Sequence, residues 1–189
     1  MGLINAMIKL EVPLVLPLQE DGYSCVPRCV KMVFMYISNC LEGRAPDMDI
    51  DEIADITETR KDGTLIEDVR NLNENKQVIQ MIPSLEFDVS LNPHSLSEIE
   101  DELENHRPLI AFVELSDGNR RCPHAVVITG FKKNGEHLIF YNDPIFGEQE
   151  EEIGSFMSRW ERVDRVLVKV KIGKREQRLL EEYTRKERV

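Results

Sequence analysis

The sequence has few basic residues relative to its acidic ones, and it has no long apolar run. Its 24 Lys and Arg stand against 35 Asp and Glu, which gives a formal net charge of −11 at pH 7. General binding to nucleic acid or to anionic membranes requires clustered Lys and Arg, so we expect neither partner. No stretch approaches the ~20 apolar residues that cross a bilayer. The apolar segment of a signal peptide would be interrupted by Lys9, Glu11, Pro13 and Pro17. We therefore expect a cytoplasmic protein without a membrane segment.

Internal repeats and low-complexity tracts are also missing, and cysteines are few. A chain of 189 residues is long enough for one well-buried core and short for two, and 41% hydrophobic residues supports a globular fold. In a reducing compartment the four cysteines are expected to be free thiols. We predict one domain over residues 1–172 and a charged helix or tail, solvated or facing a partner, over residues 173–189.

The spacing of apolar residues is helical in the first half of the chain and typical of strands in the second. Three- and four-residue spacing from Val26 to Leu41 predicts a buried helix, with Ser24 as its cap and Gly43 at its end. Shorter helices are predicted over 49–56, 64–76 and 95–106, the last two opened by capping boxes. Strands rich in Val, Ile and Phe are predicted over 109–115, 124–131, 137–142 and 165–172. Helices followed by an antiparallel sheet indicate an α+β domain.

Cys25 stands where a polar, turn-forming stretch meets the first predicted helix. Unpaired N–H groups and the positive end of the helix dipole favour thiolate over thiol at such a position. In isolation, a cysteine in a buried helix is more often a small apolar core residue. The functional interpretation therefore depends on which side chains the fold brings to Cys25.

The sheet is predicted to bring His124 and Asp143 together. Asn134 and Gly135 form a strong hairpin signal, and a two-residue turn there places Lys133 opposite Glu136. The same register places Phe131 opposite Leu138, Ile128 opposite Tyr141 and Val126 opposite Asp143. His124 and Asp143 then lie diagonally on one face, with Cβ atoms roughly 7–8 Å apart or somewhat less. Asn142 points to the other face, and a three-residue loop would exchange the two faces.

Four separated motifs resemble the bacteriocin-processing peptidase domains of peptide exporters and their stand-alone relatives. They are Gln19, the Ser-Cys-Val-Pro helix start at Cys25, the Pro-His-Ala-Val-Val strand at 123–127, and the Asn-Asp-Pro-Ile-Phe-Gly segment at 142–147. The resemblance covers about residues 16–160 and implies a papain-like fold with helices packed on an antiparallel sheet. Val26 stands where these domains commonly have glycine.

The resemblance also implies a role for each matching residue. Cys25 would be the nucleophile, His124 the general base and acid, and Asp143 the group that fixes the imidazole tautomer. Gln19 would donate its side-chain amide to the oxyanion, beside the backbone N–H of Cys25. The expected activity is thiol-dependent hydrolysis of peptide bonds, which includes leader-peptide processing, with a peptide or protein substrate and without a cofactor.

Three alternatives remain open from the residues. Zinc could be held by Cys25, Cys29, Cys122 and His124 if the helix packs against the strand. A peptidase-like module could bind a peptide or protein without cutting it. The same thiol chemistry could also serve acyl or amide transfer other than proteolysis. Cys122 is in addition a candidate redox partner of Cys25, and the oligomeric state is not predicted.

Overall fold

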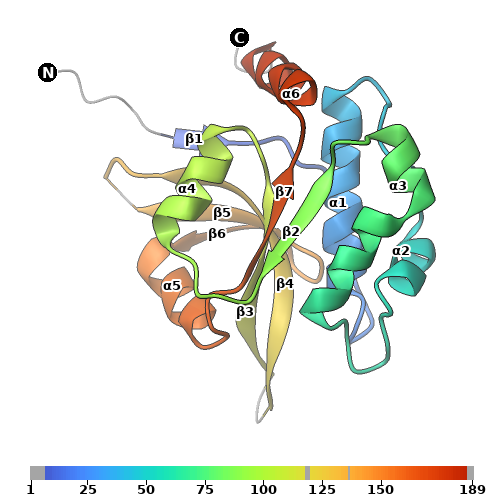
Figure 1. The fold of residues 1–189 in the computed structure, drawn as a ribbon. Helices are drawn as coiled ribbons and strands as arrows, with labels where there is room; N and C mark the ends of the chain where they lie inside the picture. Colours follow the sequence, from blue (N-terminus) through green and yellow to red (C-terminus); the bar gives the residue numbers. More distant parts are fainter. Residues whose placement is uncertain (1–6, 118–119, 136, 187–189) are drawn as a thin grey trace, which may run out of the picture.

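One antiparallel sheet organises the protein. The computed structural model describes residues 7–117, 120–135 and 137–186, and within them seven strands run in the order β2-β7-β3-β4-β5-β6, with β1 paired to β4 (Figure 1). The strands are β1 (Met7–Lys9), β2 (Glu86–Ser90), β3 (Leu109–Asp117), β4 (Arg120–Lys132), β5 (Leu138–Asp143), β6 (Gly147–Glu152) and β7 (Leu167–Lys171). The four strands expected from sequence are present, and β1, β2 and β6 were missed. Strand β6 contains four glutamates, a residue depleted in strands, so its pairing with β5 comes from the tight turn before it.

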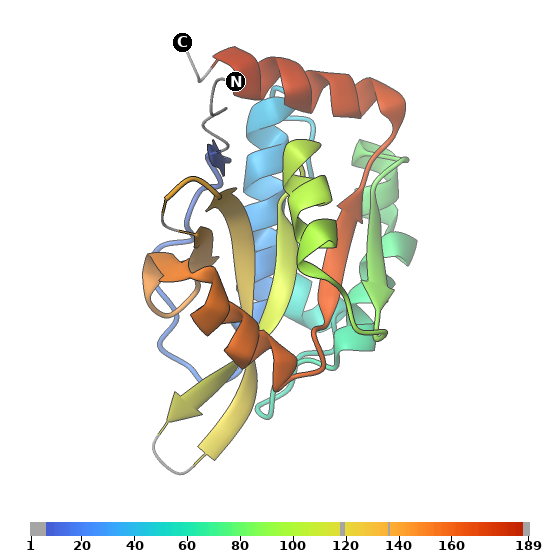
Figure 2. The same cartoon turned by 90° about the vertical axis from the view of Figure 1, so that its left-hand side faces the viewer.

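Helices cover the sheet, as the α+β prediction required. They are α1 (Cys25–Cys40), α2 (Ile50–Ile56), the 3₁₀ helix η1 (Ile66–Glu74), α3 (Lys76–Met81), α4 (Leu96–Glu104), α5 (Ile153–Glu161) and α6 (Lys174–Lys186). Helix α1 packs on β4 and β3, and α5 packs on β3, β5 and β6 (Figure 2). The apolar face predicted for α1 is buried throughout, from Val26 at 2% exposure to Leu41 at 2%. None of the helices in the described ranges is both long and apolar enough to cross a membrane.

Two predicted caps are wrong. The side chain of Ser24 makes no capping bond to α1, because its hydroxyl donates to Asp21 and accepts from Arg28. Thr64 opens no capping box either, because its hydroxyl is hydrogen-bonded to the Thr59 hydroxyl at 2.7 Å. Hydroxyl side chains can bind several local partners, and here side chains three to five residues away replace the helix N–H groups. The capping box at Ser95 does form.

The C-terminal helix α6 is less solvated than its charged sequence suggested. Leu180 is 1% exposed and Thr184 is 6% exposed, and the helix packs against α1. Gln177 donates its side-chain amide to the Asn105 carbonyl at 2.6 Å. One face of this helix therefore belongs to the core.

The hairpin between β4 and β5 differs from the predicted register near its turn. Phe131 faces Ile139 and Lys132 faces Leu138, one residue away from the predicted pairs, while Glu136 lies outside the described residues. A bulge between Ile128 and Gly130 then shifts the register by one, so that Ile128 faces Tyr141 as predicted. The bulge thus restores the face on which Asp143 points.

Gly130 is required where the bulge ends. A Cβ atom at this position would overlap the carbonyl oxygen of Ile8 and lie 2.8 Å from the Cα of Lys9. Strand β1 crosses this point to pair with β4, with Ile8 opposite Phe131. Only glycine allows the two backbones to approach so closely.

Candidate active site

Cys25 is the first residue of α1, and its half-buried side chain lies at the edge of a cleft. The turn before it is held by Asp21, whose Oδ1 accepts hydrogen bonds from the Tyr23 N–H at 2.8 Å and the Ser24 N–H at 2.7 Å. The Asp21 carboxylate, rather than Ser24, therefore binds N–H groups at this helix start. Arg28 braces the same turn by donating to the Pro17 carbonyl at 2.8 Å. The position of the thiol is fixed by this hydrogen-bonded loop.

His124 and Asp143 form the predicted contact. The Nε2 of His124 donates to Oδ1 of Asp143 at 2.9 Å, and both residues are 3% exposed. The same Oδ1 accepts from the N–H groups of Ile145 at 2.8 Å and Phe146 at 3.2 Å. Three donors on one buried oxygen fix the carboxylate, and the carboxylate in turn fixes the orientation of the imidazole.

Burial and two neighbouring groups, Asp143 and Cys25, decide the protonation of His124. Burial by itself lowers the pKa, but hydrogen bonds with Asp143 and Cys25 and the negative charge of both partners outweigh it and raise the pKa to about 9. The contribution of Cys25 places this thiol next to the imidazole, since short-range interactions of this kind need contact. At neutral pH the arrangement therefore favours a protonated imidazole at His124.

Gln19 is buried beside the same loops, at 6% exposure. Its backbone N–H donates to the Pro144 carbonyl at 2.7 Å, which joins the segment around Gln19 to the turn after Asp143. Its side-chain Nε2 donates to the Asp21 carbonyl at 2.8 Å and to Asp21 Oδ1 at 3.3 Å. The Oε1 atom is buried and has no hydrogen-bond partner among the described residues.

The other three thiols differ from Cys25 in their surroundings. Cys29 is fully buried, and burial together with the charges of Cys25 and Asp143 raises its pKa well above the ordinary value. Burial raises the pKa of Cys40 to about 12. Cys122 is exposed at the cleft, two residues before His124. No group of three or more His, Cys, Asp and Glu side chains in the described parts of the chain could hold a metal ion, so the zinc alternative has no support there.

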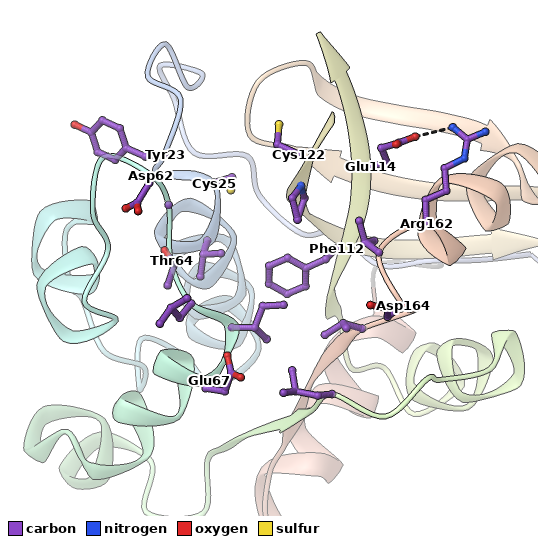
Figure 3. Close-up of a pocket in the computed structure, with 18 of the residues that line it drawn as sticks. Tyr23, Cys25, Asp62, Thr64, Glu67, Phe112, Glu114, Cys122, Arg162 and Asp164 are labelled. Carbon is purple, nitrogen blue, oxygen red and sulfur yellow. Dashed lines mark hydrogen bonds and ion pairs between the residues drawn. The ribbon is translucent and has the colours of Figure 1, made fainter. Parts of the chain in front are cut away.

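The cleft beside Cys25 has a volume of about 650 Å³ and runs between the helical half and the sheet. Figure 3 shows Cys25, Cys122 and Asp62 at one end, Phe112 on the floor, and Glu67 and Asp164 at the other end. Its walls come from the α1 start, the segment 62–67, β3, β4 and the segment 162–166. A peptide chain has room to lie along it against the thiol.

The profile of the Peptidase_C39 like family matches residues 9–168, which is most of the chain. The chain belongs to the Peptidase_C39 like family. Two solved structures share its fold. A C39-like peptidase from Bacillus anthracis has a TM-score of 0.58 and 13% identity, covering 87% of this chain and 96% of that chain. A double glycine motif protease from an AMS/PCAT transporter, in complex with the leader peptide, has a TM-score of 0.55 and 17% identity. The match covers 87% of this chain and 94% of that chain. No curated protein matches the sequence.

For this family member, sequence reasoning found the four candidate site residues but missed those that hold them. The structure brings Cys25, His124 and Asp143 together and places Gln19 against the loops on either side. Asp21 was missed, although an Asp-Gly pair three residues before a helix is a known turn signal. Arg162 was also missed. It donates to the 6%-exposed Glu114 at 2.6 Å, and because the two residues lie 48 positions apart, no local pattern could have paired them.

Proposed function

We propose that this protein is a cysteine peptidase that hydrolyses peptide bonds with Cys25, His124, Asp143 and Gln19. The observation that carries the proposal is the buried His124–Asp143 hydrogen bond of 2.9 Å beside a thiol that opens onto a cleft. A carboxylate that orients an imidazole, which in turn contacts a thiol, is the arrangement needed to activate a nucleophile. Membership of a peptidase family supports the same reaction class.

In the proposed reaction the Cys25 thiolate attacks the peptide carbonyl carbon, and a C–S bond forms as the carbonyl electrons move to oxygen. Collapse of this intermediate breaks the C–N bond, and the departing amine takes a proton from the His124 imidazolium. Water then attacks the thioester and gives a proton to neutral His124. Release of the carboxylic acid regenerates the thiolate. Asp143 holds the ring throughout.

Gln19 and the backbone N–H of Cys25 are the proposed oxyanion donors. In the resting arrangement the Gln19 amide donates two hydrogen bonds to Asp21, and the bond to Oδ1 is the longer one at 3.3 Å. This longer bond is the one that an oxyanion would replace, while the 2.8 Å bond to the Asp21 carbonyl keeps the amide in place. The oxyanion carries developing charge and is the stronger acceptor only in the transition state, which is when catalysis needs it.

Selective alkylation of the four thiols tests the proposal. Iodoacetamide near pH 6 is expected to label Cys25 ahead of Cys29, Cys40 and Cys122, because only Cys25 is accessible beside a cationic imidazole. The readout is mass-spectrometric mapping of labelled peptides over time. Equal labelling of all four thiols, or faster labelling of Cys40, contradicts the assignment of the nucleophile.

The pH dependence of turnover tests the role of Asp143. Since His124 must be protonated to release the amine and its pKa is raised to about 9, kcat/KM should fall as pH rises through about 9. Asp143→Asn removes the largest contribution that raises this pKa, so the alkaline limb should move toward lower pH and turnover at pH 8 should drop. Profiles of kcat/KM from pH 5 to 10 give the result. Asp101→Asn, at an exposed position on α4, is the matched control and should leave the profile unchanged.

Leader peptides are among the proposed substrates, because the solved double glycine motif protease with a similar fold is in complex with one. Acyl transfer to another amine would use the same thioester, and product analysis separates the two reactions. A peptide-binding module without activity would retain the cleft and show no turnover with any peptide.

A further inference from the structure

The cleft beside Cys25 is larger and more apolar than a small-residue substrate requires. Its volume of about 650 Å³ is lined by apolar side chains that include Phe112, Val166, Leu65, Leu91 and Val163. Leu65 is 68% exposed, Leu91 47% and Tyr23 38%, and all three lie at this cleft. Large apolar side chains left in water at one concave surface indicate a binding site for an apolar group.

Carboxylates surround this apolar surface. Asp62, Glu67 and Asp164 line the cleft and are exposed, and none has an ion-pair partner within the described part of the chain. The fourth carboxylate of the lining, Glu114, is paired with Arg162 at 2.6 Å, and this arginine is the one Lys or Arg among the lining residues that the structure describes. The cleft therefore keeps an excess of negative charge, with Asp62 on the side of Cys25 and with Glu67 and Asp164 on opposite walls farther from Cys25 (Figure 3).

We propose that the cleft binds peptides with a large apolar side chain flanked by Lys or Arg. This proposal rests on the proposed peptidase function, whose substrate class it specifies. The apolar side chain packs on Phe112 and is surrounded by Leu65 and Leu91, and the flanking cations lie beside the carboxylates of the lining. Concave, low-dielectric walls concentrate the field of those carboxylates on a bound cation. The overall charge of −11 adds to the attraction.

A bound peptide with two glycines in place of the large apolar residue would leave the apolar surface of the cleft in contact with water. Full burial of a phenylalanine side chain strengthens binding by roughly 10–100-fold relative to glycine. Exposed charge pairs add a smaller factor, about five- to thirtyfold for two lysines at low salt, and this factor decreases as salt screens the charges. The two contributions are separable because only the second depends on salt.

The test measures binding of three acetylated heptapeptide amides to the Cys25→Ala protein by NMR titration. The peptides are Gly-Gly-Lys-Phe-Lys-Gly-Gly, the same sequence with Gln for both Lys, and the same sequence with Gly for Phe. The first is expected to bind about five- to thirtyfold more tightly than the second at 50 mM NaCl, with the ratio falling toward one at 0.5 M. It is also expected to bind at least about tenfold more tightly than the third.

Two triple variants locate the effect. Asp62→Asn/Glu67→Gln/Asp164→Asn should lose the preference for Lys, and asparagine tolerates the φ of +59° at position 164. The matched control Glu104→Gln/Glu150→Gln/Glu182→Gln removes three exposed charges that do not line the cleft and should keep the preference. Salt dependence in the protein without these changes provides a measurement that does not depend on the variants folding.

The outcomes separate this inference from the proposed function. Equal binding of the Lys and Gln peptides, binding of the Gly peptide as tightly as the Phe peptide, or no binding of any peptide overturns the inference. Turnover of the same peptides by the protein with Cys25 intact tests the peptidase function. A preference in binding without turnover keeps the inference and overturns the proposed function. Turnover without a preference in binding keeps the proposed function and overturns the inference.

Discussion

Cys25→Ala and His124→Ala should each lower kcat by at least about 10⁴-fold on any peptide that the protein cleaves. Neither group acts alone, because the thiolate needs the imidazolium to form and to release the amine, so each single change removes nearly the whole effect. The double variant should be scarcely slower than either single one. Steady-state kinetics with an active-site titration gives the comparison.

His137→Ala is the matched control for the histidine change. His137 is exposed just before β5, and its removal should leave kcat and KM unchanged. In His124→Ala, Asp143 keeps the N–H groups of Ile145 and Phe146 as partners, so circular dichroism should report a folded protein. A Cys25→Ala protein with full activity would end the peptidase proposal, because Cys25 is the thiol that lies beside the imidazole held by Asp143.

Gln19→Ala should lower kcat by roughly 10²–10³-fold with little change in KM, since it removes a donor that is used only when the oxyanion forms. The rate at which iodoacetamide labels Cys25 should remain close to that of the unchanged protein, because alkylation creates no oxyanion. This contrast between two reactions of one thiol separates transition-state stabilisation from activation of the nucleophile.

Gln80→Ala, at an exposed position on α3, is the control for this change and should affect neither reaction. If Gln19→Ala slows alkylation as much as turnover, the loop from Gln19 to Ser24 has moved and the role of Gln19 is structural. If kcat is unaltered, the oxyanion is held by other donors.

The elements that sequence predicted well are those whose signals are local. The buried face of α1 follows from apolar spacing alone, and all of its predicted core positions, from Val26 to Leu41, are nearly inaccessible to solvent. The capping box at Ser95 needs only residues within one turn, and it forms. Strand β6 escaped prediction because its pairing with β5 stabilises it against its own sequence preference. The helix predicted over 64–76 is present as the 3₁₀ helix η1 from Ile66 to Glu74.

The contact between His124 and Asp143 was predicted by a register that is only partly right. The two-residue turn is wrong near Phe131, where the true pairing is displaced by one residue, and this alone would have turned Asp143 to the other face. The bulge before Gly130 restores the register. Its position depends on the close approach of β1, which comes from the far N-terminal end of the chain.

The sequence by itself determined the chemistry of the candidate site: a thiol at a helix start, a histidine and a carboxylate on adjacent strands, and a glutamine six residues before the thiol. These depend on residue type and on helical or strand periodicity, which short segments carry. Only the tertiary structure decided that β1 fixes the bulge and that Glu114 pairs with Arg162 beside an otherwise acidic cleft. Those contacts join segments whose backbones converge only after folding, and the free energy that selects them comes from burying the whole core at once.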